Sequence, residues 1–269
     1  MTFYLHQNDS CFVIHDALIQ NKLTKKALNL KKNHIIFVAP LYLDIMFDHK
    51  YVNKIFQISQ VRESFSKIRF YIFKFFHKLN ISNDVNNVSR FEYSKSHFDS
   101  YESIRHRVDF LVSMLTNNVK INRDINMLVI GPRYESEIFG YIGAGINRII
   151  AIDTFSYSKL IKVGNMHSLE FESNTFDVLL CGWTLAYSSD VNLAVEEMSR
   201  VLKLGGKLIV SFDTNLDLIP ISIEQIKLTN MNEIPFIDLL DNFKLHSYTI
   251  GKTSWSDTIV ASFCLEKVK

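Results

Sequence analysis

The hydrophobic pattern of the second half of the chain predicts a series of short buried strands. Continuous apolar runs with glycine or polar residues at their ends are typical of strands that are covered on both faces. Four such runs occur, at residues 127–131, 148–153, 176–182 and 207–213.

Helical patterns separate these runs. Residues 135–145 place apolar side chains on one face, and Gly145 is a plausible residue to end that helix. Residues 190–206 begin with Asp190, a candidate N-cap, and end at a pair of glycines. The first unit of strand, helix and strand therefore implies parallel pairing with a right-handed crossover.

Two alternating runs close the chain, at residues 243–250 and 257–267, and predict an antiparallel pair at one edge of the sheet. Together these patterns predict an α/β fold. We expect a Rossmann-like, doubly wound and mostly parallel sheet with an antiparallel edge pair, preceded by a mainly helical N-terminal region.

The first half of the chain has a different pattern. Amphipathic helices are predicted at 15–30 and 101–118, whereas the apolar run at 33–47, interrupted by Pro40, fits either a strand with a helix or a loop with a helix. The aromatic and basic segment 66–80 allows three interpretations. A buried helix with solvated lysines is favoured over a membrane-surface helix and over a nucleic-acid face.

Charge and glycine content also divide the chain. The net charge of +2 arises from 18 basic and 11 acidic residues up to residue 125, followed by 12 basic and 17 acidic residues. All nine glycines lie at or after Gly131. We therefore predict two domains, with residues 1–125 forming a basic lid or acceptor site and residues 126–269 the Rossmann domain.

Several classes of protein are disfavoured. The chain has no apolar stretch long enough to span a bilayer and no secretory signal pattern at its start, so we expect a cytoplasmic protein. Its three cysteines are widely spaced and its histidines form no HxxxH or HxH pair, so neither disulfides nor a metal site is predicted. No HExxH, GxSxG or P-loop pattern occurs.

One region resembles a known family. The stretch "GNMHSLEFESNTFDVLLCGWTLAYSSD", followed by "AVEEMSRVLKLGGKLIVS", is similar to the acidic loop, fourth strand and following helix of class I S-adenosylmethionine-dependent methyltransferases, in particular their type 11 domain. The resemblance covers about residues 127–267. It implies a doubly wound sheet that binds S-adenosyl-L-methionine across the carboxyl ends of its first strands, as topology alone would suggest.

The resemblance assigns cofactor-binding positions in four places. Gly131 matches the first glycine of the family's glycine-rich loop, and Asp153 matches the carboxylate that holds the ribose hydroxyls. A pair beside the adenine and a strand exit facing the methionine portion complete the assignment. These positions are Asn165 with Met166 for the pair, and Cys181, Gly182 and Trp183 for the strand exit.

The loop itself departs from the family pattern, because Arg133 and Glu135 stand where glycines are expected. A dinucleotide needs glycines so that its pyrophosphate can approach a helix N-terminus, whereas S-adenosylmethionine has no phosphate. Glutamates near the turn could accept a hydrogen bond from its ammonium, and Arg133 could pair with its carboxylate. The competing interpretation is that Arg133 and Tyr134 fill the pocket.

Candidate catalytic residues are few, because methyl transfer depends mainly on positioning and needs a base only for some acceptors. His167 could be a base at the rim of the pocket, although a structural imidazole is favoured. Tyr187 could contact acceptor or cofactor. Trp183 could line the acceptor pocket, and Asp213, at the end of its strand, is a further acceptor-site candidate.

We therefore expect a methyltransferase acting on a small-molecule or glycan-type hydroxyl or amine. One alternative is a non-catalytic binding or scaffold protein built on the same fold. A weaker alternative is a nucleic-acid methyltransferase, although the scattered lysines give no clear nucleic-acid surface. The sequence leaves the acceptor and the oligomeric state open.

Overall fold

A computed structural model describes residues 3–5, 12–14, 50–76, 80–81, 101–214, 242–252 and 259–269. The predicted helix at 15–30 and the undecided segment at 33–47 lie outside these ranges. Within them, no helix is both long and apolar enough to cross a membrane.

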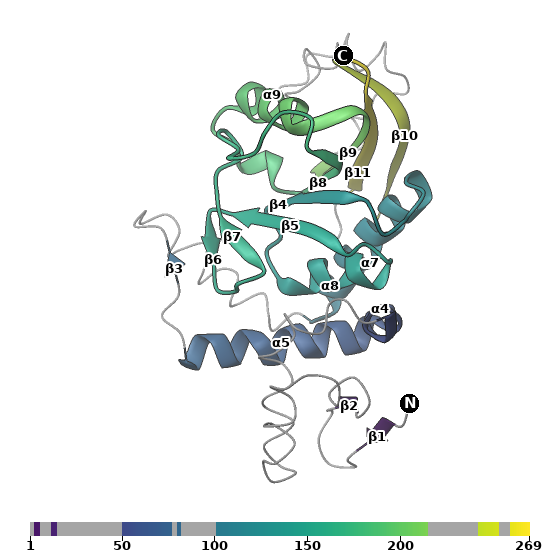
Figure 1. The fold of residues 1–269 in the computed structure, drawn as a ribbon, viewed down its shortest axis with the longest axis vertical. Coiled ribbons are helices and arrows are strands. Elements are labelled where there is room, and N and C mark those ends of the chain that lie inside the picture. The colour runs from purple at the N-terminus through teal and green to yellow at the C-terminus, as the bar shows by residue number, and fades with distance from the viewer. Residues whose placement is uncertain are drawn as a thin grey trace.

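A seven-stranded mixed sheet forms the centre of the protein, in the order β7-β5-β4-β8-β9-β11-β10 (Figure 1). Strands β4, β5, β7, β8 and β9 are mutually parallel, whereas β11 pairs antiparallel with both β9 and the edge strand β10. The predicted doubly wound sheet with an antiparallel edge pair is therefore confirmed. The strands are β4 (Asn126–Ile130), β5 (Arg148–Asp153), β7 (Ile161–Val163), β8 (Phe176–Gly182), β9 (Leu202–Thr214), β10 (Phe243–Lys252) and β11 (Ile259–Lys267).

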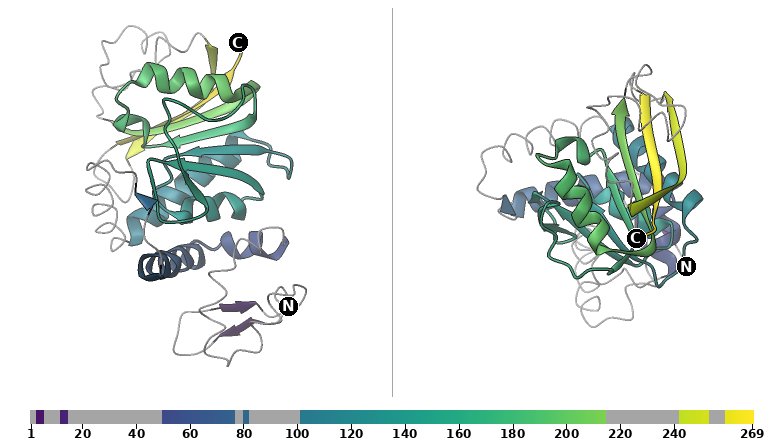
Figure 2. Two further views of the ribbon diagram at one scale, coloured as in Figure 1. Left: turned by 60° about the vertical axis from the view of Figure 1, so that its left-hand side comes forward. Right: turned by 90° about the horizontal axis from the view of Figure 1, so that it is seen from above.

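Helices cover both faces of this sheet (Figures 1 and 2). Helices α7 (Tyr101–Asn118) and α8 (Glu135–Gly143) lie on one face, and α9 (Val191–Val201) lies on the other. Alternate residues of β4 divide between the two cores: Met127 packs on the α8 side, and Leu128 packs on the α9 side. This alternation follows from the period of two along a strand.

Two more helices form an outer layer against α8. Helices α4 (Lys50–Phe56) and α5 (Ser59–Phe76) both contact α8, and α5 runs along its outer side (Figure 1). Phe70 and Arg69 of α5 are 1% exposed. The segment predicted at 66–80 is thus helical from residue 66 to residue 76, and the burial of Arg69 and Phe70 favours the core interpretation over a membrane or nucleic-acid face.

The remaining described elements are short. Strand β1 (Phe3–Leu5) pairs with β2 (Phe12–Ile14), and β3 (Asn80–Ile81) pairs with β6 (Phe155–Ser156). A 3₁₀ turn, η2 (Leu185–Tyr187), follows β8. The proposed division of the chain at residue 125 stays a prediction.

Most element boundaries agree with the predicted pattern. Helix α7 spans the predicted 101–118, and Asp190 caps α9 by accepting a hydrogen bond from the Leu193 N–H. The glycine stop of α9 was wrong, because the helix ends at Val201 and the two glycines lie inside β9. The short segment after β5 forms a third parallel strand, β7, and no helix lies between β5 and β7.

The close approach of α4 to α8 makes a first prediction. A Cβ atom on Gly143 would lie 2.6 Å from the backbone oxygen of Phe56. This oxygen belongs to the main chain, so it cannot move aside as the end of a flexible side chain could. We expect Gly143→Ala to lower the free energy of unfolding by about 1–3 kcal/mol through overpacking. Urea denaturation measures this change.

Gly251→Ala is the matched control, because a Cβ there meets nothing within 4 Å. We expect its free energy of unfolding to stay within about 0.5 kcal/mol of the wild type. Equal stability of both variants would show that α4 does not approach α8 as described.

Candidate functional site

The carboxyl ends of three neighbouring strands define the candidate site. Strand β4 lies between β5 and β8. After β4 the chain forms β5 and β7 on one side of it, and it then crosses over to form β8 on the other side. Open α/β sheets bind their ligands at such a switch point. The loops that follow β4, β5 and β8 therefore form the expected binding edge.

The loop after β4 begins at Gly131, which has a positive φ of 68°. Its N–H donates to the Ile152 carbonyl of β5 at 2.8 Å. A Cβ on this glycine would lie 2.1 Å from Thr184 Oγ1, in the loop after β8. Glycine is thus required here both for backbone conformation and for close contact between the two loops.

Asp153 ends β5, beside this loop. Burial raises the pKa of its carboxyl to about 6, despite hydrogen bonds that favour the charged form and the nearby Arg133. One of these bonds comes from the backbone N–H of Thr154, at 2.6 Å. A partly desolvated carboxylate at the end of the second parallel strand suits a ligand that brings its own hydroxyl donors.

Arg107 of α7 brings a cation to the end of β8. Its guanidinium donates to the Gly182 carbonyl at 2.7 Å and lies 4.7 Å from the centre of the Trp183 ring. It also pairs with Glu137 of α8, with 3.6 Å between the charged atoms. Its Nε is buried and makes no hydrogen bond within the described part of the chain.

Glu137 is the second carboxylate at this edge, and its side chain is 3% exposed. Burial raises the pKa of Glu137, and the charges of Arg107 and Arg133 partly offset the shift. The negative charge of Asp153 adds to it. Two arginines and two carboxylates therefore act on one another across the loops after β4 and β5.

Trp183 has an unusual backbone at the strand exit. Its φ is 60°, which non-glycine residues adopt rarely and often at functional sites. Its N–H donates to the Ser211 carbonyl at 2.6 Å, and its indole Nε1–H donates to Asp213 Oδ1 at 3.0 Å. These bonds direct the ring between Arg107 and the end of β9.

Part of the chain is similar to known methyltransferases. A family model described as a methyltransferase domain, of type 11, matches residues 145–210. The demethylmenaquinone methyltransferase of Lactococcus lactis is 35% identical over 74 residues, which are 28% of this chain and 29% of that relative. Residues 145–210, which include β5, β7 and β8, are thus similar to a methyltransferase domain. The chain spans less than a third of the length of this curated relative.

Solved structures are similar to the described fold at low identity. The YcgJ protein from Bacillus subtilis is 13% identical, with a TM-score of 0.43, over 61% of this chain and 99% of that chain. The N-methyltransferase NodS from Bradyrhizobium japonicum, solved in complex with S-adenosyl-L-homocysteine, is 13% identical with a TM-score of 0.43. That match covers 62% of this chain and 87% of NodS.

Of the predicted cofactor residues, the structure brings Gly131, Arg133, Asp153, Gly182 and Trp183 to the carboxyl edge of the parallel strands. Glu135 has a different environment. It is fully buried, and both of its carboxylate oxygens bond to Arg69 of α5. We therefore leave Glu135 out of the set that faces the cofactor.

The side chains of Cys181 and Met166 also pack inside the protein. Both belong to the core on the α9 side, and burial raises the pKa of the Cys181 thiol to about 12. Their side chains thus contribute to the hydrophobic core, which leaves the backbone for contact with a ligand.

Asn165 and His167 form one turn at the end of β7. Asn165 Oδ1 accepts from the His167 backbone N–H at 3.0 Å and contacts His167 Nδ1 at 2.8 Å. His167 Nε2 contacts Ser188 Oγ at 2.6 Å and accepts from the Asp190 N–H at 3.4 Å. Both ring nitrogens are engaged, which favours the structural interpretation of His167 over a base. Tyr187, by contrast, is 59% exposed.

Sequence reasoning missed Arg107, and it included Glu137 only as one of the glutamates near the turn, without assigning it a site position. Arg107 lies in α7, before the first strand of the sheet, where the family pattern assigns nothing. Glu137 follows Glu135 by two residues in a helix whose residues are all buried. Its acidic side chain on a buried helix was an available signal, because buried charges need partners.

The pKa of Asp153 makes a prediction about stability. Because this pKa is raised from 3.8 to about 6, the folded protein keeps a proton that the unfolded chain has already lost between these pH values. Ionised Asp153 therefore opposes folding at higher pH. We expect Asp153→Asn to gain on the order of 1–2 kcal/mol relative to the wild type between about pH 4.5 and pH 7.5.

Urea denaturation at several pH values measures this difference. Asp124→Asn is the control, since Asp124 lies at the surface with only an exposed pair to Arg148. Its effect should stay within about 0.5 kcal/mol. A pH-independent difference between Asp153→Asn and the wild type would contradict the raised pKa.

Proposed function

We propose that this protein is an S-adenosylmethionine-dependent methyltransferase that holds its cofactor at the carboxyl ends of β4, β5 and β8. The observation that carries the proposal is the cluster of Arg107, Arg133, Glu137 and Asp153 around the switch point of the sheet. Its charges complement a ligand that carries a ribose diol at one end and an amino acid at the other.

Each charged residue has a role in this proposal. Asp153 accepts hydrogen bonds from the ribose hydroxyls, at the position that the family resemblance assigns to this carboxylate. Arg107, with its buried Nε donor, and Arg133 bind the carboxylate of the methionine portion. Glu137 stands close enough to Arg107 to balance it and accepts from the ammonium. The residues therefore fit the cofactor.

When bound, S-adenosylmethionine supplies an electrophilic methyl group on a sulfonium. The protein's contribution is positioning: the loops after β4 and β8 contact one another through Gly131 and Thr184, and Trp183 fixes the end of β8. Orientation of two reactants alone supplies a large share of the rate of such a displacement. We assign no general base.

The proposed acceptor is a small molecule or a glycan-type hydroxyl or amine, bound near Trp183. Asp213, which accepts from the Trp183 indole at the carboxyl end of β9, would orient an acceptor hydroxyl or amine there. Arg62, Arg69 and Arg107 belong to the basic N-terminal part, yet all three form ion pairs within the protein. This pairing disfavours the nucleic-acid alternative.

Isothermal titration with S-adenosyl-L-homocysteine tests the proposal. We expect the wild type to bind with micromolar affinity, and Asp153→Ala and Arg107→Met to weaken binding by about tenfold or more, because each removes a charged hydrogen bond. Lys162→Ala, an exposed residue of β7, is the control and should bind as the wild type does. Absence of wild-type binding would favour the scaffold alternative.

The affinity should also depend on pH. Asp153 accepts hydroxyl donors best when ionised, so protonation below its pKa of about 6 weakens binding. We expect the affinity for S-adenosyl-L-homocysteine to be level above about pH 7 and to fall by up to tenfold per unit below about pH 5. Titrations across this range measure the change, and Asp153→Asn should show a weaker, flatter dependence. An unchanged wild-type affinity at low pH would contradict the role of Asp153.

A further inference from the structure

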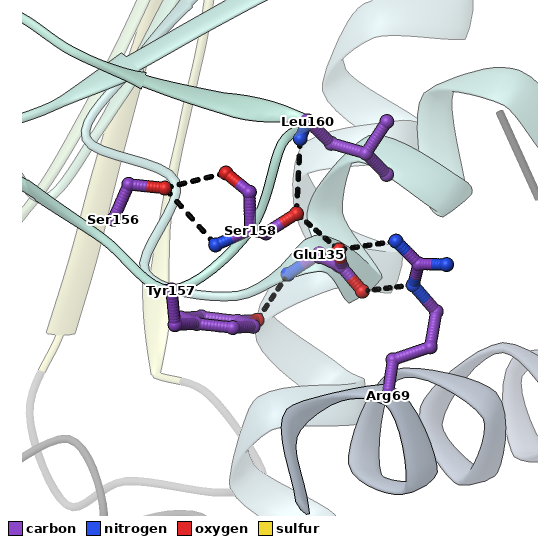
Figure 3. A network of polar contacts seen from close by, with 6 residues as sticks. All are labelled: Arg69, Glu135, Ser156, Tyr157, Ser158 and Leu160. Carbon is purple, nitrogen blue, oxygen red and sulfur yellow. Dashed lines mark hydrogen bonds and ion pairs between the residues drawn. The ribbon is translucent and has the colours of Figure 1, made fainter. Parts of the chain in front are cut away.

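A buried network surrounds Glu135 at the start of α8 (Figure 3). Arg69 of α5 donates to its carboxylate through two nitrogens, Nε to Oε2 at 2.7 Å and Nη2 to Oε1 at 3.0 Å. The Ser158 hydroxyl also donates to Oε1. The side chains of Arg69 and Glu135 are 1% and 0% exposed, so this is a fully desolvated, two-point ion pair.

The network joins both loops of the proposed cofactor site. On one side, Glu135 ends the loop after β4, and its backbone N–H donates to the Tyr157 hydroxyl at 2.9 Å. On the other, the Ser158 hydroxyl accepts from the Leu160 N–H at 3.0 Å, and Ser156 binds the Ser158 backbone (Figure 3). Tyr157 and Ser158 lie in the loop that follows Asp153. One carboxylate thus connects α5 to the loops after β4 and β5.

Stability alone gives a poor account of such a pair. Removing two charges from water carries a large desolvation penalty, and well-packed apolar residues often replace buried pairs without loss of stability. What an apolar pair cannot supply is direction, since the planar guanidinium and the carboxylate fix each other's orientation. The loop after β4 has only one glycine, Gly131, and Tyr134 provides no side-chain cap for α8.

We propose that the Arg69–Glu135 pair is a positioning clamp that holds the loops after β4 and β5 in register for the cofactor. In this proposal helix α5 is a fixed wall beside the site, which differs from the lid that was one of the two roles predicted for residues 1–125. Arg69 and Glu135 act through the loops and do not touch the cofactor. The effect on cofactor affinity rests on the proposed function, whereas the effect on loop order does not.

Three sets of variants test the clamp. Arg69→Met and Glu135→Gln each break the two-point pair, and Arg69→Met/Glu135→Leu replaces it with an apolar contact. Ser158→Ala removes only the link to the loop after β5. Hydrogen–deuterium exchange of peptides covering residues 131–137 and 154–160 measures loop order, and titration with S-adenosyl-L-homocysteine measures affinity. Lys207→Met, which breaks the ion pair with Glu266 between β9 and β11, is the control.

We expect both single variants at the pair to exchange faster in the two peptides and to lose about tenfold in affinity, in line with couplings carried by packed networks. The double variant should regain thermal stability but keep the faster exchange and the weaker affinity. Ser158→Ala should speed exchange mainly in 154–160. Lys207→Met should change neither peptide.

Two results would overturn the clamp: loop exchange equal to the wild type in every variant, or affinity and exchange that recover together with stability in the double variant. The latter would make the pair a purely structural contact. If the wild type itself binds no S-adenosyl-L-homocysteine, the proposed function fails, and the exchange data still decide whether the pair orders the loops.

Discussion

The complete burial of α8 is the constraint on which the rest of the described structure depends. Every residue of this helix is buried, including two glutamates in its first turn. The sheet and α7 cover one part of the helix, and α4 and α5 cover the remainder. Gly140 and Gly143 allow the backbone to approach α7 and α4, since a Cβ at either position would meet them at less than 3 Å. The N-terminal helices are therefore needed to cover this helix.

The two buried glutamates determine which cations the covering helices must supply. A buried carboxylate without a partner is strongly unfavourable, so Glu135 is paired with Arg69 of α5 and Glu137 with Arg107 of α7. The two pairs differ in geometry. In the first pair, two nitrogens of Arg69 bond to the two carboxylate oxygens of Glu135. In the second pair the charged atoms are 3.6 Å apart, and the Arg107 Nε makes no hydrogen bond among the described residues. Only the second suits exchange with a charged ligand.

The loop after β4 can depart from a glycine-rich pattern because its neighbours restrain it. Gly131 retains its positive φ and its contact with Thr184, which are the two properties that no other residue could supply. After Gly131, the side chain of Glu135 restrains the loop through its bonds to Arg69 of α5 and to Ser158 in the loop after β5. Arginine and glutamate at these positions are thus compatible with a methyltransferase domain.

The sequence by itself determined the secondary-structure elements and their order along the chain. The buried strands, α7, the Asp190 cap and the antiparallel edge pair follow from patterns within a few residues, because secondary structure depends on local periodicity. The assignment of Gly131 and Asp153 rested on the family resemblance and stays a prediction. The tertiary structure decided which charges meet. Arg69 and Glu135 are 66 residues apart, and Arg107 and Gly182 are 75 apart. Such pairs leave no local signature, so only the packing of α5 and α7 around α8 decides that Glu135 pairs with Arg69 and Glu137 with Arg107.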